Sequence, residues 1–192
     1  MIKIGVLALQ GAVYEHIKMV KKCGYDAIAV KKADQLDRID RLIIPGGEST
    51  VMGQLMEKYH LNIKIQELGR FGMPIFGTCA GMILLAKRDD KIPYSLNLIN
   101  IKVKRNAYGR QVNSFEADIT IKSLGFPNFK GVFIRAPSII SMGKNVKVLA
   151  CLDGKKVLVR EKNILVSSFH PELSQDSRLH QFFIHKIGNN SK

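Results

Sequence analysis

The 192-residue chain has few of the features that mark membrane, secreted or metal-stabilised proteins. It contains no apolar run near the roughly 18 residues that a membrane-spanning helix requires. Its first residues resemble a strand and lack the cleavage site of a signal peptide, so we expect no secretory signal. The three cysteines, Cys23, Cys79 and Cys151, are odd in number and show no C-x-x-C spacing. We therefore expect a reduced, cytoplasmic protein without structural zinc.

Acidic residues are also scarce. The chain has 30 lysines and arginines against 16 aspartates and glutamates, which gives a net charge of +14. An excess of this size occurs in proteins that bind nucleic acids. Here the basic residues are scattered among apolar ones, and no nucleic-acid-binding motif accompanies them. This pattern favours solvated faces of strands and helices, and nucleic-acid binding stays an alternative.

The first half of the chain alternates between strand-like and helix-like patterns. Buried strands are predicted at 2–9, 26–30, 41–46 and 73–77. A helix with apolar residues at Val13, Ile17 and Val20 follows the first strand and is expected to stop at Gly24. Another is expected from Ser49, with Ser49 or Thr50 as its N-cap. Such alternation predicts an α/β fold with a mostly parallel sheet and helices on both of its faces.

The second half is richer in strands. Six are predicted, at 98–105, 115–122, 131–137, 146–152, 156–161 and 164–169. The pair Asp153-Gly154 between two of these runs predicts a hairpin. An amphipathic helix over 177–188 closes the sequence. We therefore expect one α/β domain over residues 1–192, with an antiparallel extension of the sheet in its second half.

One cysteine lies between two glycines, at the point where a predicted strand passes into a predicted helix. Gly77-Thr78-Cys79-Ala80-Gly81 has the form G-x-C-x-G, the thiol version of the G-x-S-x-G nucleophile elbow. Glycines are expected there because a Cβ would clash with the neighbouring strand or helix. A helix N-terminus also favours thiolate over thiol. By itself the pattern fits a nucleophile and a small buried cysteine about equally well.

A thiolate nucleophile needs a base, and the base needs an orienting partner. His170 ends an apolar strand and is followed by Pro171 and Glu172. A residue before proline is held in an extended conformation, in which side chains two apart point the same way. Glu172 is therefore expected to hold one nitrogen of His170. The other four histidines, His16, His60, His180 and His185, are expected at the surface or half buried.

A third loop, LIIPGGEST at 42–50, leads from a buried strand into a helix. Its paired glycines, Gly46 and Gly47, would let backbone N–H groups approach a ligand closely, as an oxyanion hole or anion nest requires. The loop does not match a nucleotide-binding loop, because neither G-x-x-x-x-G-K-[ST] nor G-x-G-x-x-G occurs in the sequence.

These three motifs, in this order, resemble those of class I glutamine amidotransferases, which have a flavodoxin-like fold and a Cys-His-Glu triad. The resemblance narrows to the family of glutaminase subunits of pyridoxal 5′-phosphate synthase, the PdxT family, and extends from Ile4 to about Phe183. Its most specific part is KRNAYGRQVNSFEA at 104–117, and LALQGAVYEH, GVFIRAP and SFHPEL add to it. The stretch 88–98 is short for this family.

The resemblance implies a glutaminase in which Cys79 attacks the side-chain amide of glutamine, His170 transfers the proton and Glu172 orients His170. The backbone N–H groups of Gly47 and Ala80 would form the oxyanion hole. The implied glutamine-binding positions are Gly46, Gly47, Glu48, Ser49, Arg105, Ile134 and Arg135. No metal or organic cofactor is implied.

The resemblance also implies a partner, the barrel-shaped synthase subunit that makes pyridoxal 5′-phosphate from a pentose phosphate and a triose phosphate. Gln10, at the end of the first strand, is expected to transmit docking to the Gly46-Gly47 peptide. Other possibilities are a glutaminase that serves another acceptor, such as the histidine-pathway cyclase, and a non-catalytic binding protein. The non-catalytic alternative is disfavoured because Cys79, His170 and Glu172 are all present.

Overall fold

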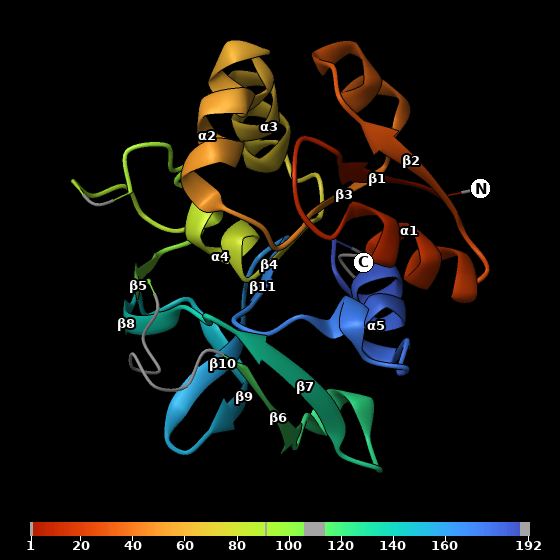
Figure 1. Ribbon diagram of the computed structural model, residues 1–192, viewed down its shortest axis with the longest axis vertical. Coiled ribbons are helices and arrows are strands. Elements are labelled where there is room, and N and C mark those ends of the chain that lie inside the picture. The colour runs from red at the N-terminus through yellow and green to blue at the C-terminus, as the bar shows by residue number, and fades with distance from the viewer. Residues whose placement is uncertain (1, 91, 106–113, 189–192) are drawn as a thin grey trace.

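The computed structural model describes residues 2–90, 92–105 and 114–188. Most of the sequence block at 104–117, namely 106–113, lies outside these described residues. Within them the chain forms a layered α/β structure with a strand-rich part at one end (Figure 1).

A seven-stranded sheet forms the centre of the fold, and five of its strands are parallel. In spatial order the strands are β2 (Asp26–Val30), β1 (Lys3–Leu7), β3 (Arg41–Ile44), β4 (Ile75–Thr78), β11 (Ile164–Ser167), β10 (Lys155–Glu161) and β9 (Lys147–Leu152). The last two are antiparallel to their neighbours. The expected mostly parallel sheet with an antiparallel extension is confirmed.

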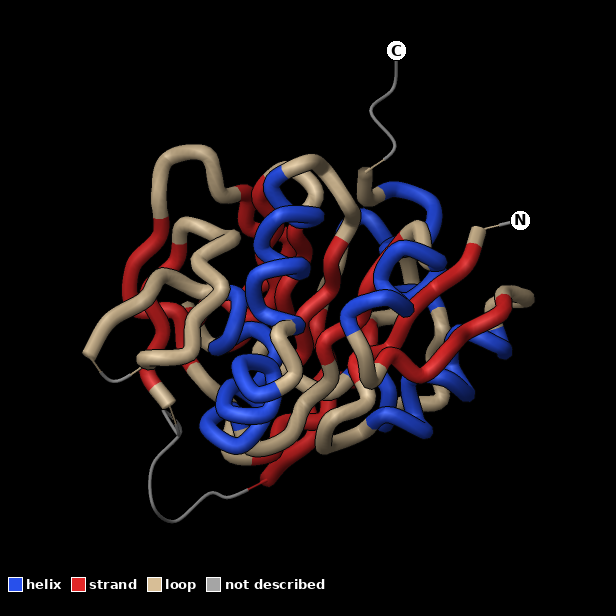
Figure 2. The backbone as a smooth tube through the Cα atoms, turned by 90° about the horizontal axis from the view of Figure 1, so that it is seen from above, coloured by secondary structure: helices blue, strands red, loops and turns tan. Residues whose placement is uncertain are grey.

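Helices cover both faces of this sheet, as expected. The helices are α1 (Val13–Lys22) and α5 (Arg178–Lys186) on one face, and α2 (Ser49–Lys58), α3 (Leu61–Arg70) and α4 (Ala80–Leu85) on the other (Figure 1). Alternation along β3 shows why both faces are buried, because Leu42 and Ile44 pack into the core under α2 and α3 while Ile43 packs into the core under α1 and α5. Helices and strands alternate through the body of the molecule when it is seen from above (Figure 2).

The strand-rich part adds two small antiparallel sheets. One pairs β5 (Ile101–Lys104) with β8 (Ser138–Met142), and the other pairs β6 (Ser114–Ile119) with β7 (Phe129–Ile134). The sequence did not predict β8, because most of its residues are exposed and show no alternation of apolar and polar side chains. The predicted hairpin is confirmed, since Asp153 and Gly154 both have the positive φ of a type I′ turn, 47° and 74°.

The predicted helix ends are partly right. Gly24 follows α1 with φ 83°, the left-handed conformation that ends many helices, as expected. The predicted cap of α2 is wrong, because Glu48 is the N-cap and Ser49 is already helical. The Glu48 carboxylate accepts hydrogen bonds from the N–H groups of Thr50 (2.9 Å) and Val51 (2.7 Å). It thereby satisfies two backbone donors at the start of the helix.

The strand order determines where a site can form. The chain moves from β1 to β2 in one direction and to β3 in the other, and the carboxyl ends of strands at such a switch point enclose a crevice. The loop with Gly11 follows β1, and the loop with Gly46 follows β3. Cys79 and His170 follow β4 and β11, so all four segments reach the same edge.

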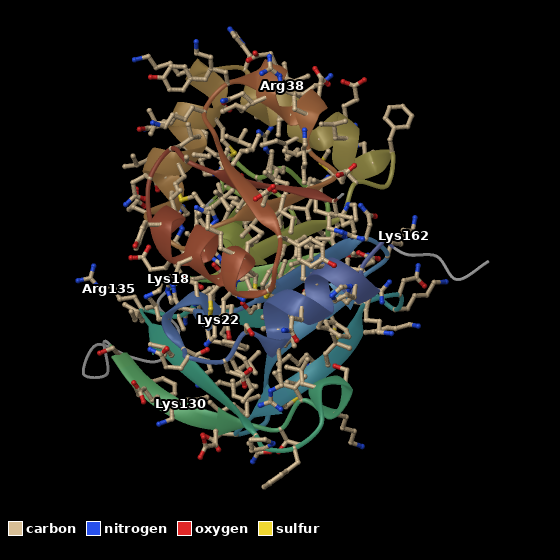
Figure 3. All side chains as sticks on the ribbon, turned by 90° about the vertical axis from the view of Figure 1, so that its right-hand side faces the viewer. Lys18, Lys22, Arg38, Lys130, Arg135 and Lys162 are labelled. Carbon is tan, nitrogen blue, oxygen red and sulfur yellow. The ribbon has the colours of Figure 1, made fainter. Side chains whose placement is uncertain are left out.

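The surface carries dispersed positive charge. Six exposed basic side chains come from α1, the 3-10 helix η1 (Ala33–Arg38), β7 and two connections, and they point outward in different directions (Figure 3). They are Lys18, Lys22, Arg38, Lys130, Arg135 and Lys162. In the part of the chain that the structure describes, none of the helices has the length and apolar character needed to cross a membrane.

Candidate active site

Cys79 occupies a sharp turn between β4 and α4. Its φ of 47° and ψ of −101° lie in a region of backbone conformation that residues other than glycine rarely adopt. The flanking glycines are needed for close packing, as expected. A Cβ on Gly77 would lie 2.7 Å from the backbone of Gly81, and one on Gly81 would lie 2.1 Å from the carbonyl oxygen of Ile44.

Contacts with the ends of two other strands hold Cys79 at the edge of the sheet. Its N–H donates to the carbonyl oxygen of Ser167, which ties the turn to the end of β11 (2.9 Å). Its Sγ lies 3.7 Å from the carbonyl oxygen of Ile134 at the end of β7. Ala80, the next residue, begins α4, so its N–H has no acceptor within the helix.

His170 and Glu172 form a buried pair next to this turn. His170 Nδ1 lies 2.7 Å from Glu172 Oε1, and the His170 N–H donates to the carbonyl oxygen of Val132 (2.8 Å). The expectation of an extended chain through Glu172 is wrong, because a short 3-10 helix, η3 (Pro171–Leu173), begins at the proline. The turn brings the carboxylate back onto the imidazole, so the two side chains meet for a different geometric reason.

Charges at this pair stabilise each other. Burial by itself would lower the pKa of His170, but hydrogen bonds to Cys79 and Glu172 and the negative charges of these groups raise it to about 10. Burial would likewise raise the pKa of Glu172, but the nearby His16 and His170 lower it. An imidazolium between the sulfur and the carboxylate is therefore the favoured state of His170 at neutral pH.

The loop after β3 packs tightly against the loop after β1. The N–H of Ala12 donates to the carbonyl oxygen of Gly46 (3.0 Å), and the N–H of Glu48 donates to Oε1 of Gln10 (2.7 Å). Gly11 has φ 98°, and a Cβ on it would lie 1.8 Å from the Gly46 oxygen. The Gly46-Gly47 peptide is thus held between two contacts from the β1 loop.

A pocket of about 630 Å³ opens at this edge of the sheet. It is lined by Gln10, Gly47, Glu48, Ser49, Cys79, Ala80, Ile83, Arg105, Ser114, Ile134, Arg135 and His170. The two candidate residues outside this lining are Gly46, whose missing Cβ makes room for the His170 ring, and Glu172, which lies behind that ring. The sequence analysis did not name Ile83 and Ser114. Ile83 could have been found, because it lies one helical turn after Cys79.

Charged groups lie at the rim of this pocket. Arg105 Nη1 donates to Thr50 Oγ1 at 3.1 Å. Burial would raise the pKa of Glu48, but the N–H groups of Thr50 and Val51 and the charge of Arg105 lower it. Arg135 is exposed and has φ 44°. The pocket therefore offers both cationic and anionic groups to a small zwitterionic ligand.

Two histidines that were expected at the surface or half buried are completely enclosed, so that expectation is wrong for His16 and His180. His16 Nδ1 lies 3.0 Å from His180 Nε2, and His16 Nε2 lies 3.3 Å from Glu172 Oε2. His60 and His185 are exposed, as expected. The reason for the error is that α1 and α5 place His16 and His180 on their sheet-facing sides.

The remaining cysteines and acidic residues form no comparable site within the described residues. Cys23 is half buried, Cys151 is exposed, and both are free thiols. Burial raises the pKa of the Cys23 thiol, which makes it a poorer nucleophile at neutral pH. No group of three or more His, Cys, Asp or Glu side chains among residues 2–90, 92–105 and 114–188 is arranged to hold a metal ion.

The chain is similar to known glutamine amidotransferases in both sequence and structure. The sequence model of the SNO glutamine amidotransferase family matches residues 6–189. The pyridoxal 5′-phosphate synthase subunit PdxT of Desulforamulus reducens is 54% identical over 185 residues, which cover 96% of this chain and 98% of that protein. The subunit of the same name from Bacillus pumilus is 52% identical over 188 residues, covering 97% and 95%. A crystal structure of a glutamine amidotransferase superimposes with a TM-score of 0.89 at 44% identity, covering 94% of this chain and 96% of that one.

Proposed function

Because the chain belongs to the SNO glutamine amidotransferase family, we propose that it is the glutaminase subunit of a pyridoxal 5′-phosphate synthase. In this proposal, residues 1–192 form one domain that hydrolyses L-glutamine to L-glutamate and ammonia. The observation that carries the proposal is the pocket that contains both Cys79 and His170, with Glu172 hydrogen-bonded behind His170.

The first half of the reaction uses Cys79 as the nucleophile. Its thiolate attacks the side-chain amide carbon of glutamine, and the carbonyl oxygen becomes an oxyanion that accepts hydrogen bonds from the N–H groups of Gly47 and Ala80. The C–N bond then breaks as His170 donates its proton to the leaving nitrogen. Ammonia and a thioester on Cys79 are the products of this step.

The second half of the reaction releases glutamate. His170 is neutral after it has lost its proton, and it takes a proton from a water molecule that attacks the thioester carbon. The C–S bond breaks, and the Cys79 thiolate and the His170 imidazolium are restored. Throughout the cycle Glu172 accepts a hydrogen bond from His170 Nδ1, which directs Nε2 of the ring toward the reacting groups.

Recognition of glutamine is assigned to the rim of the pocket. Arg105 and Arg135 are suited to the α-carboxylate, because a guanidinium offers paired donors, and Glu48 is suited to the α-ammonium group. Ser49 and Ile134 border the same pocket, and Gly46 leaves the space that the His170 ring occupies. These residues form the proposed glutamine-binding set.

Ammonia that escapes into neutral water becomes mostly ammonium, which is not a nucleophile. The proposed enzyme therefore delivers ammonia directly to a docked synthase subunit, consistent with the name shared by its relatives. We assign Gln10 to the coupling of docking and activity, because its Oε1 holds the N–H of Glu48 next to the Gly46-Gly47 peptide. Loss of one oxyanion-hole donor typically lowers kcat by about 10²–10³, so this peptide is an effective control point.

The test of the activity is glutamate release from glutamine by the purified chain, with and without the synthase subunit. We expect turnover with the synthase present, and Cys79→Ser should reduce it to background. Cys151→Ser is the matched control, because Cys151 is a free and exposed thiol outside the pocket. Undiminished turnover by the Cys79→Ser variant would refute the assignment of the nucleophile.

The role of Gln10 requires a separate comparison. The parent chain should hydrolyse glutamine faster in the complex than alone, and Gln10→Ala should lose most of that increase while still binding the synthase. Equal rates for the free and bound parent would refute activation by the partner. A fully active Gln10→Ala complex would refute the role of this side chain.

A further inference from the structure

A second imidazole lies on the far side of the catalytic carboxylate. His16 on α1 and His180 on α5 are 164 residues apart in sequence, and both are completely buried. Their rings share a hydrogen bond of 3.0 Å between His16 Nδ1 and His180 Nε2. Neither residue lines the proposed glutamine pocket, so neither has a role in the steps described above.

The two histidines are connected to the site through Glu172. Its Oε1 lies 2.7 Å from His170, and its Oε2 lies 3.3 Å from His16 Nε2. Oε2 is buried and has no hydrogen bond of good geometry with the described residues. His16 Nε2 also lies 3.2 Å from Oγ1 of Thr78, the residue before Cys79. Two imidazoles therefore flank one buried carboxylate.

The hydrogen-bonding capacity of each group favours one arrangement of protons. An ionised carboxylate only accepts, so the N–H of a neutral His16 belongs on Nε2, and Nδ1 then accepts from the Nε2–H of His180. The opposite tautomer would turn a ring lone pair toward Glu172 Oε2. It would also leave the N–H on His180 Nδ1 buried without a partner among the described residues. Unpaired buried donors of this kind are rare and costly.

Both rings are kept neutral by their surroundings. Burial lowers the pKa of His16. Glu172 and Glu15 act in the opposite direction, and His170 lowers the pKa further. Burial and the neighbouring His16 lower the pKa of His180 to about 3, and Glu172 opposes this shift. A neutral pair can donate a hydrogen bond to Glu172 without adding a second positive charge that would compete with His170.

We propose that His16 is a positioning residue that donates its Nε2–H to Glu172 Oε2, and that His180 holds His16 in the tautomer that makes this possible. The inference rests on the proposed function, since Glu172 matters for activity only if His170 is the catalytic base. With an imidazole N–H facing each of its oxygens, the carboxylate stays ionised and turned toward His170. Without His16, Oε2 would lose its 3.3 Å contact with Nε2 and would stay buried.

The first experiment measures the pH dependence of kcat/KM for glutamine hydrolysis by the complex with the synthase subunit. His16→Leu keeps an apolar volume but removes the donor, so protonation of Glu172 becomes easier and the acidic limb should move to higher pH by about one to two units. His16→Gln can still donate and should keep the acidic limb of the parent. His60→Asn is the matched control, because His60 is exposed and asparagine tolerates its φ of 54°.

A merely structural role for His16 would lower activity equally at every pH. The proposal is therefore overturned if folded His16→Leu keeps the acidic limb of the parent, or if His16→Gln shifts it as far as leucine does. Either result leaves the glutaminase assignment intact, because that assignment depends on the Cys79 variant.

The second experiment needs no activity. Nitrogen-15 NMR of the imidazoles in the parent chain should show His16 protonated at Nε2 and His180 protonated at Nε2, both neutral at pH 7. A His16 ring protonated at Nδ1 would overturn the proposal. This measurement also separates the two hypotheses, because it gives the same answer whether or not the protein hydrolyses glutamine.

Discussion

Substitution of Gly46 by alanine should greatly reduce activity while leaving the fold nearly unchanged. A Cβ at this position would lie 2.2 Å from Cε1 and 2.8 Å from Nδ1 of His170. The ring would have to retreat by about 1.2 Å to reach an ordinary contact of 3.4 Å. Gly46 does not have a positive φ, so we attribute the effect of alanine to this contact with the His170 ring.

The size of the effect follows from the geometry of the pair. His170 Nδ1 is hydrogen-bonded to Glu172 at 2.7 Å, so a retreating ring loses this bond or its alignment with Cys79. Displacement of a catalytic group by about 1 Å can lower the rate by about 10²-fold. We therefore expect kcat/KM for glutamine hydrolysis in the synthase complex to fall about 100-fold, with a thermal midpoint close to that of the parent.

Gly24→Ala is the control, because it should lower stability without lowering activity. A Cβ on Gly24 would meet no atom within 4 Å, but φ there is +83°, so alanine should cost about 1 kcal/mol of stability and no activity. Both variants are compared by glutamate release and by thermal unfolding. Parent-like turnover by Gly46→Ala would show that the His170 ring tolerates the added methyl group, and the steric reasoning would be refuted.

Three further predictions concern stability. Gly81→Ala should lower the free energy of unfolding by about 2–3 kcal/mol, because its Cβ would lie 2.1 Å from the backbone oxygen of Ile44. A urea-denaturation midpoint equal to that of the parent would contradict this prediction. Glu48→Ala should cost about 1 kcal/mol through loss of the α2 cap, and an unchanged midpoint would argue against capping. Because the folded-state pKa of His180 is depressed to about 3, the unfolded chain takes up this proton first as the pH falls below about 6.5. Below that pH, His180 should lower the free energy of unfolding by about 1.4 kcal/mol per pH unit. The effect would be disproved if a folded His180→Phe variant lost stability with falling pH as steeply as the parent.

Local patterns were sufficient for much of the fold. The strands before Gly46 and Cys79 are largely apolar, and a pattern of this kind predicts a strand buried on both faces wherever it lies in the chain. The glycines around Cys79 and the pair Asp153-Gly154 are also local signals, because each reflects a backbone conformation or a close approach within a few residues. Such features depend on short-range sterics, which the sequence carries completely.

Other features depended on neighbours that are distant in sequence. Glu48 caps α2 at a turn where its own N–H donates to Oε1 of Gln10, 38 residues earlier, whereas serine or threonine is the more common N-cap. The strand β8 forms only because β5 is available to pair with it, since its own pattern is mostly exposed. Neither outcome could be read from the segment alone.

The candidate site shows the same division. The residue types and spacings identified Cys79, His170 and Glu172 as candidates, and the structure places the first two at one pocket with Glu172 behind them. The burial of His16 and His180 could have been suspected, because each lies on the apolar stripe of its helix. Their contact with each other and with Glu172 could not. It exists because the sheet brings α1 and α5 together on one face, and only the tertiary fold determines which distant side chains meet there.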